Sequence, residues 1–390
     1  MANSPRPVGE GLREGLAIRT YRPTDRARVL AMIGRVWDDE RRRNHDFLWE
    51  WKHVRDTGPW KPGHLSRVIE RGGEVVGYSG TIPARFLIDG SEVEGAFCLD
   101  TLVDPAARGV GIRLLRDQLA RGTMLLGAAN PRTRDLWVRV SGRPGLVVRE
   151  ARKMALVLDP GAILRHRGLP APLAAAIRTA HRGVRALRGM RNRRMPAGGF
   201  VLEPVERFPP GIDALGLEFA RGFRRSVLRD RQYLDWRFVD GPVGYRIRLL
   251  RDAERRLRGY LVFRPARING RPAVLLIEIV AVGERAPAYG TMLAHVEEEA
   301  VACGAGEVQT LDPGCPILAA EMLRRGYFRR REPHHILGYL AGPAGEAADF
   351  TDAGTWYVGL GDADFEFIFF NQGVSSRIAA GDPGEVRETS

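Results

Sequence analysis

The sequence has few cysteines, no long apolar run and no cluster of metal-ligating residues. Its three cysteines, Cys98, Cys303 and Cys315, show neither pairing nor metal-binding spacing, which predicts reduced thiols, a cytoplasmic protein and no metal site. No stretch reaches the roughly 18–20 uncharged apolar residues that a membrane span needs. Residues 1–15 lack the apolar core of a signal peptide, so we expect no secretion and interpret them as a flexible tail.

The sequence also has fewer acidic than basic residues. The chain has 47 acidic and 60 basic residues, for a net charge of +13 over 390 residues, and arginine far outnumbers lysine. This balance favours anionic partners such as nucleic acid, acidic lipid or phosphorylated ligands, without choosing among them. A content of 44% hydrophobic and 27% charged residues is typical of a globular protein, and the length suits two domains.

Two segments of the chain resemble each other, which predicts two copies of one domain. Residues 77–85, GYSGTIPAR, match residues 259–267, GYLVFRPAR, at an offset of 182 residues. Three further matches keep the same order and nearly the same offset: the aromatic segments FLWEWK (47–52) and YLDWRF (233–238), the turns Asp89-Gly90 and Asn269-Gly270, and the glycines Gly111 and Gly290.

Each copy has the same order of expected elements. A helix precedes the aromatic segment, and a hairpin with a DG or NG turn follows. Then come a long strand, a glycine-bearing turn, a helix, a short strand, a second helix and closing strands. This order predicts an α+β fold with tandem domains, each a mixed sheet flanked by helices. We place the first domain at 16–160, a basic helical linker at 161–200, the second domain at 201–345, and a C-terminal strand and tail at 346–390.

The segment VDPAARGVGIRLLR (103–116) places glycines between an expected strand and an expected helix. The N-terminus of a helix presents backbone N–H groups without intrahelical partners, and glycine lets a phosphate approach them. Arg108 adds a guanidinium with several donors. The turn therefore predicts a phosphate or pyrophosphate site, although a plain tight turn would use glycine in the same way.

The pattern strand–Val-x-Pro-x-x-Arg-Gly-x-Gly-Ile–helix in this segment resembles motif A of the GNAT superfamily of N-acetyltransferases. The resemblance implies acetyl-CoA as co-substrate. It also implies a cofactor site in which the pyrophosphate lies along 108–113, the pantetheine arm pairs with the preceding strand and an asparagine lies beside the cofactor. The residues implied are Leu102, Val103, Arg108, Gly109, Val110, Gly111, Ile112, Arg113 and Asn130. The whole chain is similar to two-domain GNAT proteins found among bacterial cell-surface polysaccharide genes.

The sequence departs from the family pattern at three places. Arg113 stands where glycine or alanine is usual, and Trp137 stands where the family often has a tyrosine that protonates the leaving thiol. An indole cannot replace a phenol in that role. The second copy has the turn GERAPAYGTML, with Pro287 and a single glycine, so we expect no CoA there. Two hypotheses follow: an acetyl-CoA-dependent N-acyltransferase, or a non-catalytic GNAT-like binding or scaffold protein.

Acetyl transfer needs a base for the amine, donors for the oxyanion and an acid for the thiol. In the strand SEVEGAFCLDTLV (91–103), alternation predicts that one face carries Glu94, Cys98, Asp100 and Leu102. We expect burial to raise the pKa of Asp100 and suit it to act as the base. The alternatives are that Asp100 pairs with an arginine or caps a turn, and that Glu94 is the base. Backbone N–H groups near Leu102 are the expected oxyanion donors, and Tyr78 or water is the expected acid.

The linker 161–199 contains nine arginines and no acidic residue. Within 173–191, apolar residues recur at helical spacing with the arginines mostly opposite, which predicts an amphipathic helix. Its apolar stripe either packs between the two domains or makes weak contact with an anionic membrane. We expect no nucleic-acid partner, because no nucleic-acid-binding module is recognisable. The expected acceptor is a small-molecule primary amine, with amino sugars, including nucleotide-linked ones, as candidates.

Overall fold

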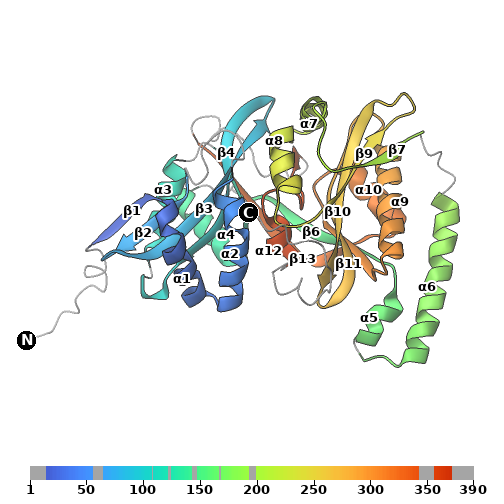
Figure 1. The fold of residues 1–390 in the computed structure, drawn as a ribbon, viewed down its shortest axis with the longest axis horizontal. Helices are drawn as coiled ribbons and strands as arrows, with labels where there is room; N and C mark the ends of the chain where they lie inside the picture. The colour runs from blue at the N-terminus through green and yellow to red at the C-terminus, as the bar shows by residue number, and fades with distance from the viewer. Residues whose placement is uncertain are drawn as a thin grey trace, which may run out of the picture. The chain divides into compact units, whose positions relative to one another are not determined.

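The chain packs as two compact units (Figure 1). The computed structural model describes residues 15–55, 65–107, 109–121, 124–142, 147–166, 168–192, 199–341 and 355–370, and describes only the backbone of 147–149, 182 and 185–192. Unit 1 comprises residues 1–85, 94–147 and 337–350, and unit 2 comprises residues 86–93, 148–336 and 351–390. Each unit therefore contains a segment from the other half of the chain.

These units do not follow the bounds 16–160 and 201–345 that the repeat predicted. The reason is the strand β6 (Val147–Val157), which closes the first copy in sequence but pairs with β12 (Glu307–Leu311) of the second. The antiparallel register runs from Val157–Glu307 to Lys153–Leu311. A strand belongs to the sheet in which its backbone groups find partners, so 148–157 belong to unit 2.

Unit 1 is built on five strands in the order β1-β2-β3-β4-β5. The first three pair antiparallel, and β4 pairs parallel with β5. The strands are β1 (Leu16–Thr20), β2 (Arg67–Arg71), β3 (Glu74–Ile88), β4 (Ser91–Val103) and β5 (Met124–Ala129). The helical elements are η1 (Pro23–Asp25), α1 (Arg26–Val36), α2 (Asp39–His53), η2 (Pro105–Ala107), α3 (Gly111–Arg121) and α4 (Pro131–Ser141).

Helices cover both faces of this sheet. Val68 of β2 packs in the apolar cluster of α1 and α2, whereas its neighbour Ile69 packs in a cluster with Leu114 of α3. Successive residues of a strand point to opposite faces, so α1 and α2 lie on one face and α3 lies on the other. This arrangement is the α+β fold with a mixed, helix-flanked sheet that the element order predicted.

In unit 2, strands are neighbours in the order β6-β12-β11-β10-β9-β7, and β8 and β14 lie off this path. Along this order only β11 and β12 pair in parallel, and the other neighbours are antiparallel. The further strands are β7 (Val201–Val205), β8 (Arg225–Val227), β9 (Arg246–Arg251), β10 (Leu257–Ile268), β11 (Arg271–Ala281), β13 (Phe328–Leu340) and β14 (Trp356–Tyr357). The helices are α5 (Pro160–His166), α6 (Ala171–Asn192), α7 (Ile212–Arg221), α8 (Arg231–Leu234), the π-helical η4 (Asp235–Val239), α9 (Arg285–Ala302), α10 (Pro316–Arg325) and α12 (Phe365–Phe370).

The two expected hairpin turns are confirmed. Asp89 and Gly90 have φ of 48° and 87°, and Asn269 and Gly270 have φ of 51° and 75°. Two consecutive residues with positive φ define the two-residue turn whose twist matches that of the flanking strands. The turns join β3 to β4 and β10 to β11, so the strongest local signals in the sequence set the register of both hairpins.

The C-terminal segment 355–370 differs from its expected form. It contributes the short strand β14, which pairs with β8, and then the helix α12 in place of a second strand. Asp362 lies between β14 and α12. Its carboxylate accepts the Gly359 N–H at 2.7 Å and also pairs with Arg229 at 2.8 Å, and both side chains are fully buried. The segment is thus an internal part of unit 2.

Arg229 is the cation on which this segment depends. Its guanidinium lies 3.4 Å from Glu278 of β11 and over the ring of Tyr357 at 4.6 Å. Burial raises the pKa of Glu278 and of Asp362, while the Arg229 charge opposes the rise. Two carboxylates therefore share one buried guanidinium, and removal of Arg229 leaves both without their cation.

We expect Arg229→Met to lower the free energy of unfolding of unit 2 by about 3–5 kcal/mol, the usual cost of breaking a buried ion pair on one side. The matched control is Arg224→Met, because Arg224 pairs with Asp89 in the same unit but is exposed. The control should cost less than about 1 kcal/mol. Urea denaturation measures both, and equal shifts of the two midpoints would contradict this account of the segment.

Candidate active site

The connection from β4 to α3 leaves open space beside two glycines. Gly109 has φ of 93°, a conformation that favours glycine, and a Cβ added there would meet no atom within 4 Å. At Gly111, the first residue of α3, an added Cβ would meet only Val103 Cγ2, at 3.4 Å. The backbone at the start of α3 is therefore approachable by a ligand, as the phosphate-site prediction requires. Arg108 lies outside the described residues.

Buried side chains hold this turn in place. Val110 packs with Ala107 and Leu114 in the cluster on the α3 face, and the Asp104 N–H donates to the Val76 carbonyl at 2.9 Å. Ile112 is half-buried, whereas Arg113 is exposed. The Arg113 side chain therefore does not fill the space beside the glycines.

Strand β4, which leads into the turn, pairs with β5 over only part of its length. The parallel pairs of β4 with β5 run from Ala96–Leu125 to Cys98–Gly127, and β4 continues to Val103. A Cβ at Gly127 would lie 2.8 Å from the Cys98 carbonyl oxygen, so glycine is needed for this close approach. The predicted pairing of Leu102 and Val103 with a pantetheine arm remains a prediction.

At Asp100, the alternation of side chains between the two faces of the sheet is interrupted in β4. Its φ is 50°, in the left-handed region that residues other than glycine rarely adopt. Cys98 packs in the cluster with α3 and α4, whereas Leu102 packs in the cluster with α1 and α2. The expectation that alternation would place these residues on one face is therefore wrong. A left-handed residue in a strand acts as a bulge that re-aims the side chains after it.

The bulge directs the Asp100 carboxylate to the α2 side of the sheet. Lys52 Nζ lies 2.6 Å from Asp100 Oδ2, and His45 Nε2 lies 3.0 Å from Oδ1. His53 Nε2 is 3.8 Å from Oδ2. We call Asp100, Lys52, His45, His53 and Tyr78 the Asp100 cluster.

Asp100 is an ionised carboxylate. Burial by itself would raise its pKa, but the charge of Lys52 and the contacts with His45 and His53 hold the pKa well below its ordinary value. The expectation that burial would raise the pKa of Asp100 was wrong, because it left out a buried ammonium from another element. A carboxylate with a low pKa is a weak base, and its charge is suited to holding a cationic group.

Helix α2 supplies the other members of the cluster. Its N-cap is Asp38, whose side chain accepts the Arg41 N–H at 2.6 Å. His45, Trp49, Lys52 and His53 then follow at spacings that place them along one helix face. Sequence reasoning treated this segment only as aromatic, although the same spacing was the signal that would have found the basic residues.

His45 is the most exposed member of the cluster. Its side chain is 16% exposed, compared with 8% for Asp100, 2% for Lys52 and 1% for His53. Its Nδ1 lies 2.8 Å from the Arg41 carbonyl oxygen, and its ring lies 5.3 Å from that of Trp37.

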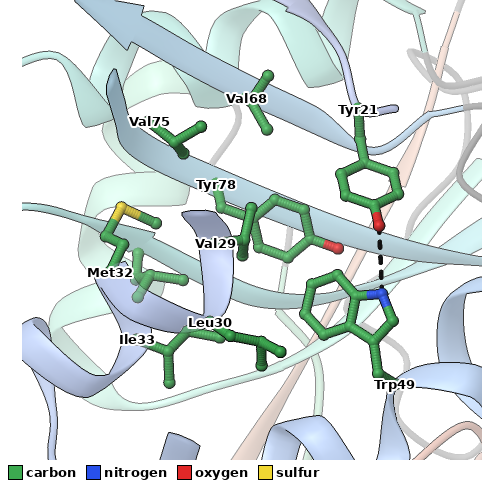
Figure 2. Close-up of a cluster of buried hydrophobic side chains, with 10 residues drawn as sticks. Tyr21, Val29, Leu30, Met32, Ile33, Trp49, Val68, Val75 and Tyr78 are labelled. Carbon is green, nitrogen blue, oxygen red and sulfur yellow. Dashed lines mark hydrogen bonds between the residues drawn. The ribbon is translucent and has the colours of Figure 1, made fainter. Parts of the chain in front are cut away.

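Tyr78 lies in the interior. Figure 2 shows its ring among Val29, Met32 and Trp49, and the Trp49 indole donates to the Tyr21 hydroxyl at 3.2 Å. The Tyr78 hydroxyl lies 3.4 Å from the His53 ring. Burial, with a further contribution from Asp100, raises the pKa of Tyr78 well above its ordinary value. The phenol therefore keeps its proton at neutral pH, and its predicted role as the thiol acid remains a prediction.

The remaining predicted residues lie in plain structural settings. Glu94 is exposed near the start of β4. Asn130 caps α4, and its side chain accepts the Thr133 N–H at 2.9 Å. Trp137 is buried in the apolar cluster of α3 and α4. Among the described residues, no group of three or more His, Cys, Asp and Glu side chains is arranged to hold a metal ion.

The second copy of the turn has a different form. After β11, Gly283 has φ of 69° and α9 begins at Arg285, with Pro287 in its first turn. Gly290 lies inside α9, and an added Cβ there would be 3.3 Å from Glu321 Oε1. This glycine borders a packed side chain, not the open start of a helix. The absence of CoA from the second copy stays a prediction.

Comparison with known proteins identifies the fold. No protein-family model matches the sequence, and no curated protein sequence matches it. A GCN5-related N-acetyltransferase from Anabaena variabilis is 12% identical, with a TM-score of 0.57 over 83% of this chain and 72% of that one. A probable N-acyltransferase from Enterococcus faecalis is also 12% identical, with a TM-score of 0.54 over the same shares.

A third similar structure is Saccharomyces cerevisiae N-myristoyltransferase with bound myristoyl-CoA. It is 11% identical, with a TM-score of 0.53 over 92% of this chain and 87% of that one. At such identities the likeness concerns the fold alone. The chain has the fold of GCN5-related N-acetyltransferases over most of its length, and the expected fold class is confirmed.

The buried His53 generates a testable pH dependence. Burial lowers its pKa against the opposing effect of Asp100, so the folded protein keeps His53 neutral where the unfolded chain protonates it. Below the ordinary pKa of about 6.5, unfolding therefore takes up a proton, and stability is lost as the pH falls. Between pH 7 and 5, the free energy of unfolding of the wild type should fall by up to about 1.4 kcal/mol per pH unit more than that of His53→Gln.

Denaturation midpoints at several pH values measure this difference. The matched control is His166→Gln, a substitution at an exposed histidine of α5, which should keep the wild-type pH dependence. If His53→Gln follows the wild-type curve in parallel, His53 is not held neutral in the folded protein.

Proposed function

We propose that the protein is an acetyl-CoA-dependent N-acyltransferase that acetylates a primary amine. The observation that carries the proposal is the turn between β4 and α3. There, Gly109 and Gly111 leave the start of an 11-residue helix open to a ligand. The N–H groups and the dipole of such a helix end favour a phosphate or pyrophosphate. The fold likeness to N-acyltransferases supports the same activity.

We place the amine at the Asp100 cluster. The cofactor turn packs on the α3 side of the sheet, while the Asp100 carboxylate faces α2. We place the cofactor at the turn that follows β4 and the acceptor amine at Asp100 of the same strand. Bound acetyl-CoA would supply an activated acetyl thioester. The ionised Asp100 would hold the incoming ammonium, and water would take its proton.

The acceptor that we propose is a small amine of the amino-sugar class. Beside His45, the guanidinium of Arg41 lies over the Trp37 ring at 5.3 Å. An aromatic face next to a cation suits an amphipathic ring that carries a phosphate or another anionic group. The net charge of +13 supports an anionic acceptor in the same way.

A binding protein without catalysis is the competing proposal. Trp137 is buried in the apolar cluster of α3 and α4, so the position at which the family often has a tyrosine acid offers no phenol. A chain that retains CoA but acetylates no amine would favour this alternative. Measurement of acetyl-CoA consumption against a panel of amines separates the two proposals.

Gly111→Leu tests the cofactor turn. The added side chain meets only Val103 near its base, so the fold should persist while the space for a phosphate is lost. Calorimetric titration should show CoA binding weakened by at least about tenfold, since the contact depends on close approach to the backbone. The control is Gly290→Ala in the second copy, which should bind CoA as wild type does. Unchanged affinity in Gly111→Leu, or two equivalents of CoA per chain, would refute the site.

Asp100→Asn tests the acceptor side. Asparagine tolerates the left-handed backbone at this position but carries no charge. The ratio kcat/KM for the amine at neutral pH should fall about 10–100-fold, the usual size for a hydrogen bond to a charged group. The fall should come mainly from a higher KM for the amine, with CoA affinity unchanged. The control is Glu94→Gln on the same strand, which should keep wild-type kinetics. Wild-type turnover in Asp100→Asn would remove Asp100 from the site and direct attention to Glu94.

A further inference from the structure

The helix α6 presents an apolar stripe to solvent. Leu173 is 51% exposed and Val184 is 48% exposed, and Ala180, which lies between them on the same helix face, is also exposed. Ile177 is half-buried. These four residues follow the spacing of one face of a helix.

Another face fixes α6 to its unit. Ala174 is buried, and a Cβ added at Gly161 of α5 would lie 2.5 Å from the Ala174 carbonyl oxygen. Arg178 lies 3.9 Å from Asp159. Figure 1 shows α5 and α6 as an adjacent pair of helices. Because α6 is anchored through Ala174, its exposed stripe has a defined orientation and forms a surface.

The charge around the stripe selects the occupant. Residues 161–199 contain nine arginines and no acidic residue. An exposed apolar stripe within an arginine-rich helix is typical of helices that lie in the surface of a membrane with anionic lipids. A protein partner with a complementary apolar face would also have to supply many acidic groups. No described helix of the chain is both long enough and apolar enough to cross a membrane.

We propose that α6 is a docking surface for an anionic membrane. Leu173, Ile177, Ala180 and Val184 enter the headgroup region, and the positive charge of the arginine-rich segment attracts the anionic lipids. A helix of 22 residues lying flat covers about 33 Å of the surface. The proposal is independent of the proposed acyl transfer, because it rests on a helix outside the Asp100 cluster.

Sedimentation of the full chain with vesicles tests this surface. Vesicles of phosphatidylglycerol and phosphatidylcholine should bind the wild type, whereas vesicles of phosphatidylcholine alone should not. The variant Leu173→Glu/Val184→Glu should lose at least tenfold in binding. The control Val301→Glu/Leu323→Glu changes two other exposed apolar residues of unit 2 and introduces the same charge, so it should bind as wild type does.

Several outcomes would overturn the proposal. The first is a wild-type protein that does not bind the anionic vesicles. The second is a stripe variant that binds these vesicles as well as the control does. Displacement from vesicles by an equal charge of duplex DNA or RNA, together with wild-type binding in the stripe variant, would assign the surface to nucleic acid. A wild-type dimer in solution that becomes monomeric in the stripe variant would assign it to a second copy of the chain.

Discussion

A carboxylate buried at a strand bulge must be neutralised, and unit 1 is arranged around the way in which Asp100 meets this requirement. The left-handed backbone at Asp100 turns its side chain toward α2, where Lys52 and His45 bind it. The ion pair thereby ties α2 to the strand that leads into the glycine turn. The orientation of the helix, the bulge and the start of the turn depend on one another through this contact.

Unit 2 contains a cluster of related residue types that is buried away from solvent. Tyr260 matches Tyr78 in the repeat, and Glu278 lies at a register shift of the β10–β11 hairpin as Asp100 lies at the bulge of β4. There the cation is Arg229, and the segment 355–370 adds a second carboxylate, Asp362. The carboxylates and the guanidinium are buried, whereas His45 keeps the cluster of unit 1 in contact with solvent. This difference favours a functional site in unit 1 and a structural role for the matching residues of unit 2.

The fold and the chemistry rest on different observations. Likeness to N-acyltransferases at 10–12% identity concerns the arrangement of helices and strands. The chemistry rests on two local features, the open helix start at Gly109 and Gly111 and the ionised carboxylate that faces α2. Each is a property of a few named residues, so single substitutions test each.

The sequence by itself determined what depends on neighbours in the chain. The Asp89-Gly90 and Asn269-Gly270 turns, the helix after Gly111 and the amphipathic α6 follow from local backbone preferences and from helical spacing. Contacts between distant residues were decided only by the tertiary structure. Asp100 meets Lys52 and Asp362 meets Arg229 from different elements, and these contacts set the charge state of each acid. The placement of β6 beside β12 could not be predicted from neighbours in the chain. The backbone groups of a strand can pair equally well with more than one partner strand.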